Sequence, residues 1–225
     1  MSKDPTNPYV SRGGLKLRHA LDEFKIDVTG LTCADLGAST GGFTDCLLQA
    51  GAAKVYSVDT AYGEFAWKLR NDPRVVLMER TNALHAGPPA GGVDLVVVDL
   101  GWTPQRLLVP AALKWLRTFP SAMATSSSLW RDTGAPPPSH SHEDVAMARK
   151  GRIISLIKPH YEAPDLTKGA PKGILTDEQC ESITQRVVAE LPSMGVRVAG
   201  LTRSPVLGGS KGKGNAEWLV VLEPS

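Results

Sequence analysis

Short apolar runs alternate with amphipathic stretches along most of this chain. In residues 15–24, Leu17, Leu21 and Phe24 recur at i, i+4 and i+7, which is the spacing of one face of an α-helix. The same reading predicts strands at residues 33–37, 54–59, 75–79, 93–100 and 152–158, and helices at residues 43–50, 65–70 and 104–116.

A last group of elements follows at the carboxyl end of the sequence. Thr176 supplies an N-cap, and an acidic first turn follows it, so a helix is expected to run to about residue 191. Strands are predicted at residues 196–202 and 217–222, and the Gly, Ser and Lys-rich loop between them suits an antiparallel hairpin. The fold class is therefore α/β: a Rossmann-like, mostly parallel sheet of seven strands, with an antiparallel edge hairpin and helices on both faces. Ligands of such sheets bind at the carboxyl ends of the strands.

Composition indicates one ordinary globular domain over residues 1–225. Of the 225 residues, 42% are hydrophobic, and 25 Lys and Arg stand against 23 Asp and Glu, so any nucleic-acid surface has to be local. The three cysteines include no Cys-x-x-Cys pair, which argues against a disulfide framework or structural zinc. The polar start and the lack of a run of about 18 apolar residues predict a cytoplasmic protein without a membrane segment.

Two segments stand apart from the alternating pattern. Residues 1–30 form an N-terminal extension and the opening helix, and residues 117–148 are rich in Pro, Ser, Thr and His, as expected of a flexible insertion. His140 and His142 in this insertion lack a third ligand on rigid structure, so no metal site is predicted.

Small residues crowd the turn that follows the first predicted strand. Glycine allows positive φ and the close approach of a ligand. Ser39 occupies the second glycine position of the dinucleotide fingerprint, and no Gly-Lys-Ser or Gly-Lys-Thr follows, so the turn suits an adenosyl ligand without phosphates, such as S-adenosylmethionine. Another nucleotide, or a turn that merely packs closely, remains an alternative. The candidates are Asp35, Gly37, Ser39 and Gly42 around the amino-acid end and Asp59 for the ribose.

Charged residues stand at strand ends, where bulky charge is usually unfavourable. Asp99 and Lys158 end two apolar runs, and Glu217 opens a third. On a parallel sheet, Asp99 and Lys158 are expected side by side above the cofactor turn, with Glu217 brought close by the hairpin and Lys16 contributed by the opening helix. Such a cluster can tune a proton acceptor, and the alternative is a set of ordinary surface ion pairs.

Several motifs together resemble one family. They are SRGGLKL (11–17), DLGASTGGFTDC (35–46), DPRV (72–75), ERTN (79–82), VDL (98–100), LIKP (156–159) and GNAE (214–217). They are similar to the TlyA family of FtsJ-like ribosomal RNA 2′-O-methyltransferases, which have also been labelled haemolysins. The resemblance covers nearly the whole chain outside the insertion and implies a catalytic Lys-Asp-Lys-Glu tetrad at Lys16, Asp99, Lys158 and Glu217.

The resemblance also implies a mechanism. A ribose 2′-hydroxyl is a weak nucleophile that has to be oriented and deprotonated. Lys158 is expected to accept its proton or to steer its lone pair, with a pKa lowered by burial and by Lys16, while Asp99 and Glu217 orient the two ammonium groups. Asn82 is a candidate for the neighbourhood of the adenine, and the alternative is a plain turn residue.

RNA recognition is the least determined part of this interpretation. Members of the family usually carry an N-terminal RNA-binding domain, and here ten residues precede Ser11. The insertion either replaces that surface or has no function. Trp67 and Trp115 are expected in the core, whereas the candidate contacts to substrate RNA are Arg12, Arg18, Trp102, Lys211 and Lys213. A non-catalytic protein that binds S-adenosylmethionine and RNA during ribosome assembly, or a methyltransferase of another RNA, is the alternative function.

Overall fold

The computed structural model describes residues 6–117, 151–163, 165, 174–209 and 214–225. Within them, seven strands form one sheet in the order β3-β2-β1-β4-β5-β7-β6. The strands are β1 (Thr32–Leu36), β2 (Lys54–Val58), β3 (Val75–Met78), β4 (Leu95–Val98), β5 (Arg152–Ile157), β6 (Val196–Arg203) and β7 (Trp218–Pro224). The predicted fold class is confirmed, with strand ends displaced by up to two residues.

Strand direction also follows the prediction. The first five strands pair in parallel, whereas β7 lies antiparallel to both β5 and β6. The strand predicted at residues 93–100 is shorter than expected. Val93 makes only an isolated bridge to Leu116, and Asp99 leaves the ladder at the carboxyl end. Asp99 therefore lies directly after the carboxyl end of β4, where its N–H still donates a hydrogen bond to the Leu36 carbonyl of β1.

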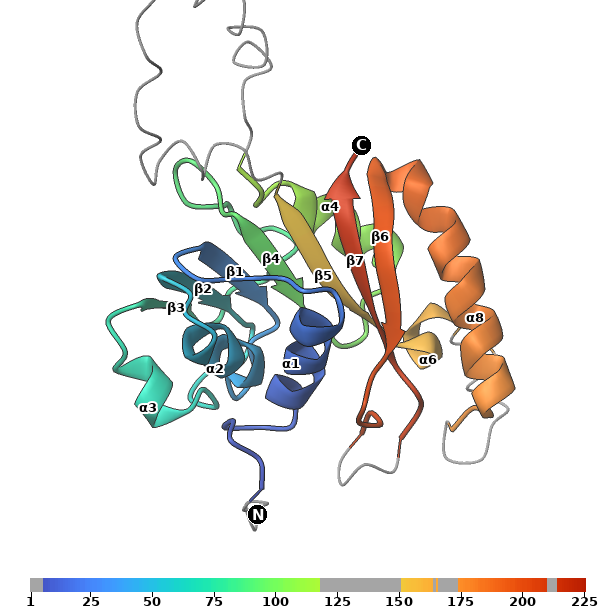
Figure 1. The fold of residues 1–225 in the computed structure, drawn as a ribbon, viewed down its shortest axis with the longest axis horizontal. Coiled ribbons are helices and arrows are strands. Elements are labelled where there is room, and N and C mark those ends of the chain that lie inside the picture. The colour runs from blue at the N-terminus through green and yellow to red at the C-terminus, as the bar shows by residue number, and fades with distance from the viewer. Residues whose placement is uncertain (1–5, 118–150, 164, 166–173, 210–213) are drawn as a thin grey trace, which may run out of the picture.

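Helices cover both faces of the sheet (Figure 1). They are α1 (Gly13–Glu23), α2 (Gly42–Gln49), α3 (Trp67–Arg70), α4 (Gln105–Leu113), α6 (Pro159–Glu162), α8 (Asp177–Glu190) and the 3₁₀-helix η4 (Leu191–Met194). The predicted N-cap of α8 is present: Thr176 Oγ1 accepts a hydrogen bond from the Gln179 N–H, and the Gln179 side chain accepts one from the Thr176 N–H, which together make a capping box.

Two apolar layers result, one on each side of the sheet. Successive side chains of a strand point to opposite faces, so Leu95 and Val97 pack with α1 and α2, whereas Val96 and Val98 pack with α4 and α8. Trp115 is fully buried in the second layer, as predicted. The prediction that Trp67 is in the core is wrong. The side chain is 76% exposed, because α3 is a single turn that buries only Leu69.

Some predictions concern residues that the structure does not describe. The insertion lies outside them apart from Arg117, and so do His140 and His142. In the part of the chain that the structure describes, no helix is long and apolar enough to cross a membrane. No group of three or more His, Cys, Asp or Glu side chains among these residues is arranged to hold a metal ion.

Candidate active site

The turn between β1 and α2 brings two backbone segments unusually close. Gly37 has φ +94°, and a Cβ at this position would lie 2.7 Å from the carbonyl oxygen of Asp99. Only glycine combines this φ with this approach. Ser39 has φ +48° in the same turn, and Gly41 at φ +95° precedes the first turn of α2. The sequence therefore places the turn directly against the end of β4.

Asp35 lies beneath this turn. It is fully buried, and one carboxylate oxygen accepts hydrogen bonds from the Thr44 N–H at 2.9 Å and the Thr44 hydroxyl at 2.7 Å. The other oxygen has no hydrogen-bond partner among the described residues. Burial raises the pKa of Asp35 to about 7 despite the Thr44 hydrogen bonds. Asp35 does not line the cavity, and its hydrogen bonds hold the first turn of α2 at Thr44.

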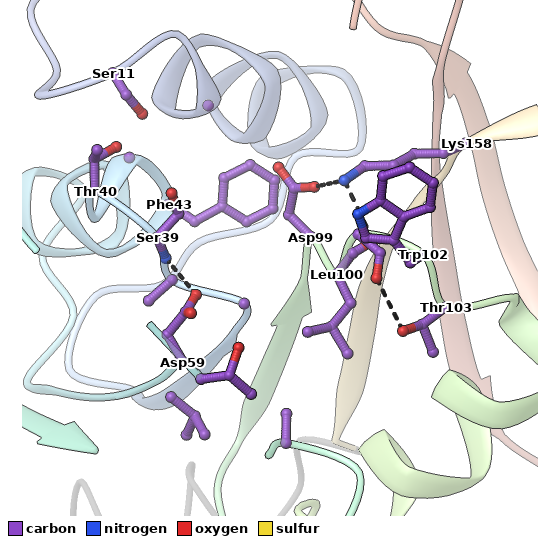
Figure 2. Close-up of a pocket in the computed structure, with 18 of the residues that line it drawn as sticks. Ser11, Ser39, Thr40, Phe43, Asp59, Asp99, Leu100, Trp102, Thr103 and Lys158 are labelled. Carbon is purple, nitrogen blue, oxygen red and sulfur yellow. Dashed lines mark hydrogen bonds and ion pairs between the residues drawn. The ribbon is translucent and has the colours of Figure 1, made fainter. Parts of the chain in front are cut away.

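A cavity of about 620 Å³ opens at the carboxyl ends of β1, β2, β4 and β5 (Figure 2). The predicted site residues on its wall are Arg12, Lys16, Gly37, Ser39, Gly42, Asp59, Asn82, Asp99, Trp102 and Lys158. Several wall residues were not predicted: Ser11, Thr40, Phe43, Thr81, Leu84, Leu100 and Thr103. Each of them lies within three residues of a predicted site residue, and this proximity in the sequence is the signal that could have identified them.

Asp59 and Asn82 mark the side of the cavity away from the charged cluster. The Asp59 carboxylate accepts hydrogen bonds from the N–H groups of Ser39 at 2.7 Å and Ala61 at 2.8 Å. The Asn82 side chain accepts one from the Leu84 N–H at 3.0 Å. Asn82 is thus a turn residue, the alternative role given to it, and it also lines the cavity.

Two ion pairs stand together at the other side of the cavity. The Lys158 ammonium pairs with Asp99 and donates a hydrogen bond to the Leu100 carbonyl at 3.3 Å (Figure 2). Lys16 Nζ pairs with Glu217 Oε2 at 2.5 Å, and both side chains are buried. β4 and β5 bring the first pair together, since Val98 lies opposite Ser155 in their register. Glu217 does not line the cavity, and its contact with the wall is the ion pair with Lys16.

The charges of this cluster set its protonation. Burial alone would lower the pKa of Lys158, but contact with Asp99 and the charge of Glu217 more than offset it, and the pKa is raised above the ordinary lysine value. Burial works against the charge of Asp99 as well, yet Lys158 and Lys16 lower its pKa. The pKa of Glu217 is raised by burial despite its pairing with Lys16. The predicted lowering of the Lys158 pKa is therefore wrong, because burial is outweighed by the contact with Asp99 and the charge of Glu217.

Aromatic side chains form the rim beside this cluster. Trp102 is 86% exposed at φ +59°, and its ring lies 4.8 Å from that of Tyr161. The Lys158 ammonium stands 5.8 Å from the Tyr161 ring centroid. Burial, together with Lys158 and Lys16, lowers the pKa of His160 to about 4, so its ring is neutral at pH 7. The exposed indole of Trp102, beside the partly buried Lys158 ammonium, provides a surface on which a planar ring can stack.

The remaining RNA-contact candidates differ in position. Arg12 lies on the cavity wall and donates a hydrogen bond to the Gly209 carbonyl. Arg18 pairs with Asp22 on the exposed side of α1 and does not reach the cavity wall. Lys211 and Lys213 lie outside the described residues. The structure thus brings Arg12 and Trp102 to the site and leaves Arg18 apart from it.

The fold and the cavity together define a class of protein. A seven-stranded sheet of this order, with a glycine turn after β1 and a cavity at the carboxyl strand ends, is the fold of S-adenosylmethionine-dependent methyltransferases. A solved structure from Listeria monocytogenes, described as a candidate S-adenosylmethionine-dependent methyltransferase, has this fold with a TM-score of 0.58 at 12% identity, over 96% of this chain and 100% of that one. The chain belongs to the FtsJ-like methyltransferase family, which matches it over residues 9–223.

Curated relatives agree with the resemblance noted in the sequence. The chain is 37% identical to the 16S/23S rRNA (cytidine-2′-O)-methyltransferase TlyA of Mycobacterium tuberculosis, over 97% of this chain and 70% of that protein. It is 36% identical to the candidate rRNA methyltransferase YqxC of Bacillus subtilis, over 95% of this chain and 65% of that protein. A crystal structure from Lactococcus lactis, described as a candidate hemolysin, has a TM-score of 0.75 at 33% identity, over 96% of this chain and 89% of that one. The chain thus spans about two thirds of the length of these two curated relatives.

Proposed function

We propose that this chain is an S-adenosylmethionine-dependent methyltransferase that methylates a ribose 2′-hydroxyl of ribosomal RNA. One observation carries the proposal: two lysines and two carboxylates from distant parts of the chain meet beside the glycine turn. Lys16, Asp99, Lys158 and Glu217 come from α1 and the ends of β4, β5 and β7, and pair there. Ordinary surface ion pairs would be exposed, whereas Lys16 is 9% and Glu217 3% exposed.

The cavity fits the cofactor. Its volume of about 620 Å³ lies within the usual range for small-molecule sites, and the glycine turn at Gly37 lies on its wall. Gly37, Ser39 and Gly42 would hold the amino-acid end, with Asp35 supporting the turn from below; Asp59 would bind the ribose, and Asn82 would lie near the adenine. When bound, the cofactor supplies a methyl group activated by the sulfonium charge.

The charged cluster would orient the nucleophile. Lys158, whose pKa is raised, carries a proton at neutral pH and can donate a hydrogen bond to a ribose hydroxyl oxygen, which directs the remaining lone pair. Asp99 fixes this ammonium from one side, and the Lys16–Glu217 pair holds the wall beside it. The steering role of Lys158 is thereby favoured over proton acceptance by this side chain, and the hydroxyl proton would leave to solvent water. Trp102 would stack on a base of the substrate.

The substrate class follows from the relatives. TlyA of Mycobacterium tuberculosis is named for cytidine 2′-O-methylation in 16S and 23S rRNA. We therefore place a cytidine of ribosomal RNA, in the naked molecule or in a ribosomal subunit, at the cavity rim beside Trp102. A role in the cytoplasm, where ribosomes are found, follows from that substrate.

The test is transfer of a labelled methyl group to RNA. Purified wild-type protein, Lys158→Met and the exposed control Lys54→Ala are incubated with labelled cofactor and with rRNA, ribosomal subunits or tRNA. Wild type and Lys54→Ala should label rRNA, and Lys158→Met should lose activity by about 10²–10⁴-fold. After alkaline hydrolysis, 2′-O-methylation leaves an alkali-resistant dinucleotide carrying the label. Absence of label in wild type would favour the non-catalytic alternative, and label in tRNA alone would change the substrate.

A further inference from the structure

Gln105, the first residue of α4, is a buried polar side chain outside the cavity. It is 1% exposed and does not line the wall. Both ends of its amide bond to β5: Nε2 donates to the Leu156 carbonyl at 3.1 Å, and Oε1 accepts from the Ser155 hydroxyl at 2.9 Å. A buried amide is favourable only when such bonds are made, so the strand fixes this side chain in one orientation.

The backbone of Gln105 makes a third connection. Its N–H donates to Glu162 Oε1 at 2.9 Å, and Glu162 belongs to α6, the short helix that begins directly after Lys158. The N-cap of α4 is Pro104, whose side chain offers no acceptor, so Glu162 supplies the negative group that the start of α4 requires. One residue thus joins α4 to both β5 and α6.

The three residues that bond to Gln105 lie on both sides of Lys158 in the sequence. Ser155 and Leu156 precede it by three and two residues, and Glu162 follows it by four. The segment from Asp99 to Gln105 begins at Asp99, whose N–H is bonded to the Leu36 carbonyl at 3.0 Å. This segment is therefore held at both ends, with the exposed Trp102 between the two anchors.

We propose that Gln105, together with Glu162, is a positioning residue that holds the Asp99 segment against Lys158 during methyl transfer. This inference rests on the proposed function. Gln105 touches neither the cavity nor the reacting groups, so its effect on the reaction passes through the Asp99–Lys158 pair. A purely structural amide would contribute to stability alone and would leave the geometry of that pair unchanged.

The first readout needs no activity. The pKa of Lys158 is measured by NMR on lysine labelled with ¹³C at Cε, in wild type, Gln105→Met and the control Leu107→Gln, whose exposed side chain lies on the same helix. Methionine keeps the volume of glutamine and removes its hydrogen bonds. If the contact between Lys158 and Asp99 loosens, it no longer offsets the lowering of the Lys158 pKa by burial. The pKa of Lys158 should therefore fall in Gln105→Met and stay unchanged in Leu107→Gln.

The second readout is kinetic. In Gln105→Met, kcat per folded enzyme should fall about 10- to 100-fold, the cost expected of a misplaced catalytic group, while the Kd for the cofactor stays at the wild-type value. Glu162→Gln, which keeps an acceptor oxygen for the Gln105 N–H, should retain more activity than Glu162→Ala. Should Gln105→Met not fold, Ser155→Ala removes one of the same hydrogen bonds and should change the pKa and kcat in the same direction.

The outcomes are separable. A Gln105→Met protein that is less stable but keeps the wild-type Lys158 pKa and kcat would overturn the inference. A wild type that methylates no RNA would overturn the proposed function instead, and the Lys158 pKa would still decide whether Gln105 positions the ion pair.

Discussion

Asp35 is fully buried and Lys158 is partly buried, and the contacts of these two ionisable side chains give them different protonation at neutral pH. Lys158 meets a carboxylate directly, which raises its pKa and keeps it charged. Asp35 meets only the N–H and hydroxyl of Thr44, and burial with the nearby Asp99 and Asp59 leaves its pKa at about 7. Contact with a charged partner therefore keeps Lys158 ionised, whereas Asp35, which has no such contact, has a pKa close to neutral pH.

Removing one partner of the Lys16–Glu217 pair should cost stability, and removing either or both should cost activity. Glu217→Leu leaves the buried Lys16 ammonium without its ion-pair partner, which should lower the free energy of unfolding by about 3–5 kcal/mol in urea titrations. The double variant Lys16→Met/Glu217→Leu should recover most of that stability and still transfer no methyl group. Arg18→Ala, which breaks the exposed Arg18–Asp22 pair, is the control and should cost no more than about 1 kcal/mol. An active double variant would contradict a role for this pair.

Asp35 should make wild-type stability fall as pH rises from about 4 to 7. Its folded pKa of about 7 lies above the ordinary aspartate value of 3.8, so the native state binds more protons than the unfolded state in that window. Asp35→Asn keeps an acceptor oxygen for Thr44 and should remove this part of the slope. Urea midpoints of both proteins across this range measure the difference, and the exposed Glu64→Gln serves as control. Parallel curves for wild type and Asp35→Asn would contradict the raised pKa.

Among the elements, the turn between β1 and α2 depends on Gly37 for two reasons that can be separated. Gly37→Ala should be more destabilising than Gly30→Ala. Both glycines have positive φ, worth about 1–3 kcal/mol for other residues, but a Cβ at Gly30 meets nothing within 4 Å, whereas one at Gly37 meets the Asp99 backbone. Thermal unfolding measures both variants, and cofactor titration should show a loss of affinity only in Gly37→Ala. Equal losses of stability would mean that the close approach adds nothing.

The elements could largely be predicted because local sequence determines them. Strand and helix periodicity, the Thr176 cap and the glycine turn all lie within short windows, and each predicted strand is present. Properties set by distant contacts could not be predicted. The Lys158 pKa depends on contact with Asp99 across two strands, and Gln105 gives no local signal of its bonds to β5, 50 residues away. Trp67 was misplaced because periodicity cannot show that α3 is too short to bury it.

For the whole molecule, the small net charge of +2 means that RNA affinity has to come from a local surface. Binding to rRNA should fall linearly on a log-log plot against salt, with a slope of about −0.7 to −0.9 per phosphate contacted. Arg12→Ala at the cavity wall should reduce that slope by about 1, whereas Arg197→Ala, which breaks a pair with Glu223 at the opposite end of the sheet, should leave it unchanged. Filter binding between low and high salt measures both. A flat line for wild type would contradict a phosphate-contacting groove.

The position of β7 has a consequence for biosynthesis. β7 comes last in the sequence yet lies between β5 and β6, and among the described strands β6 pairs with β7 alone. A nascent chain on the ribosome therefore holds β6 without a neighbour until residues 218–224 have emerged. Glu217 directly precedes β7, so Lys16 lacks its ion-pair partner until this segment has been synthesised. The four-residue charged cluster is therefore complete only after the other described strands of this sheet have been synthesised.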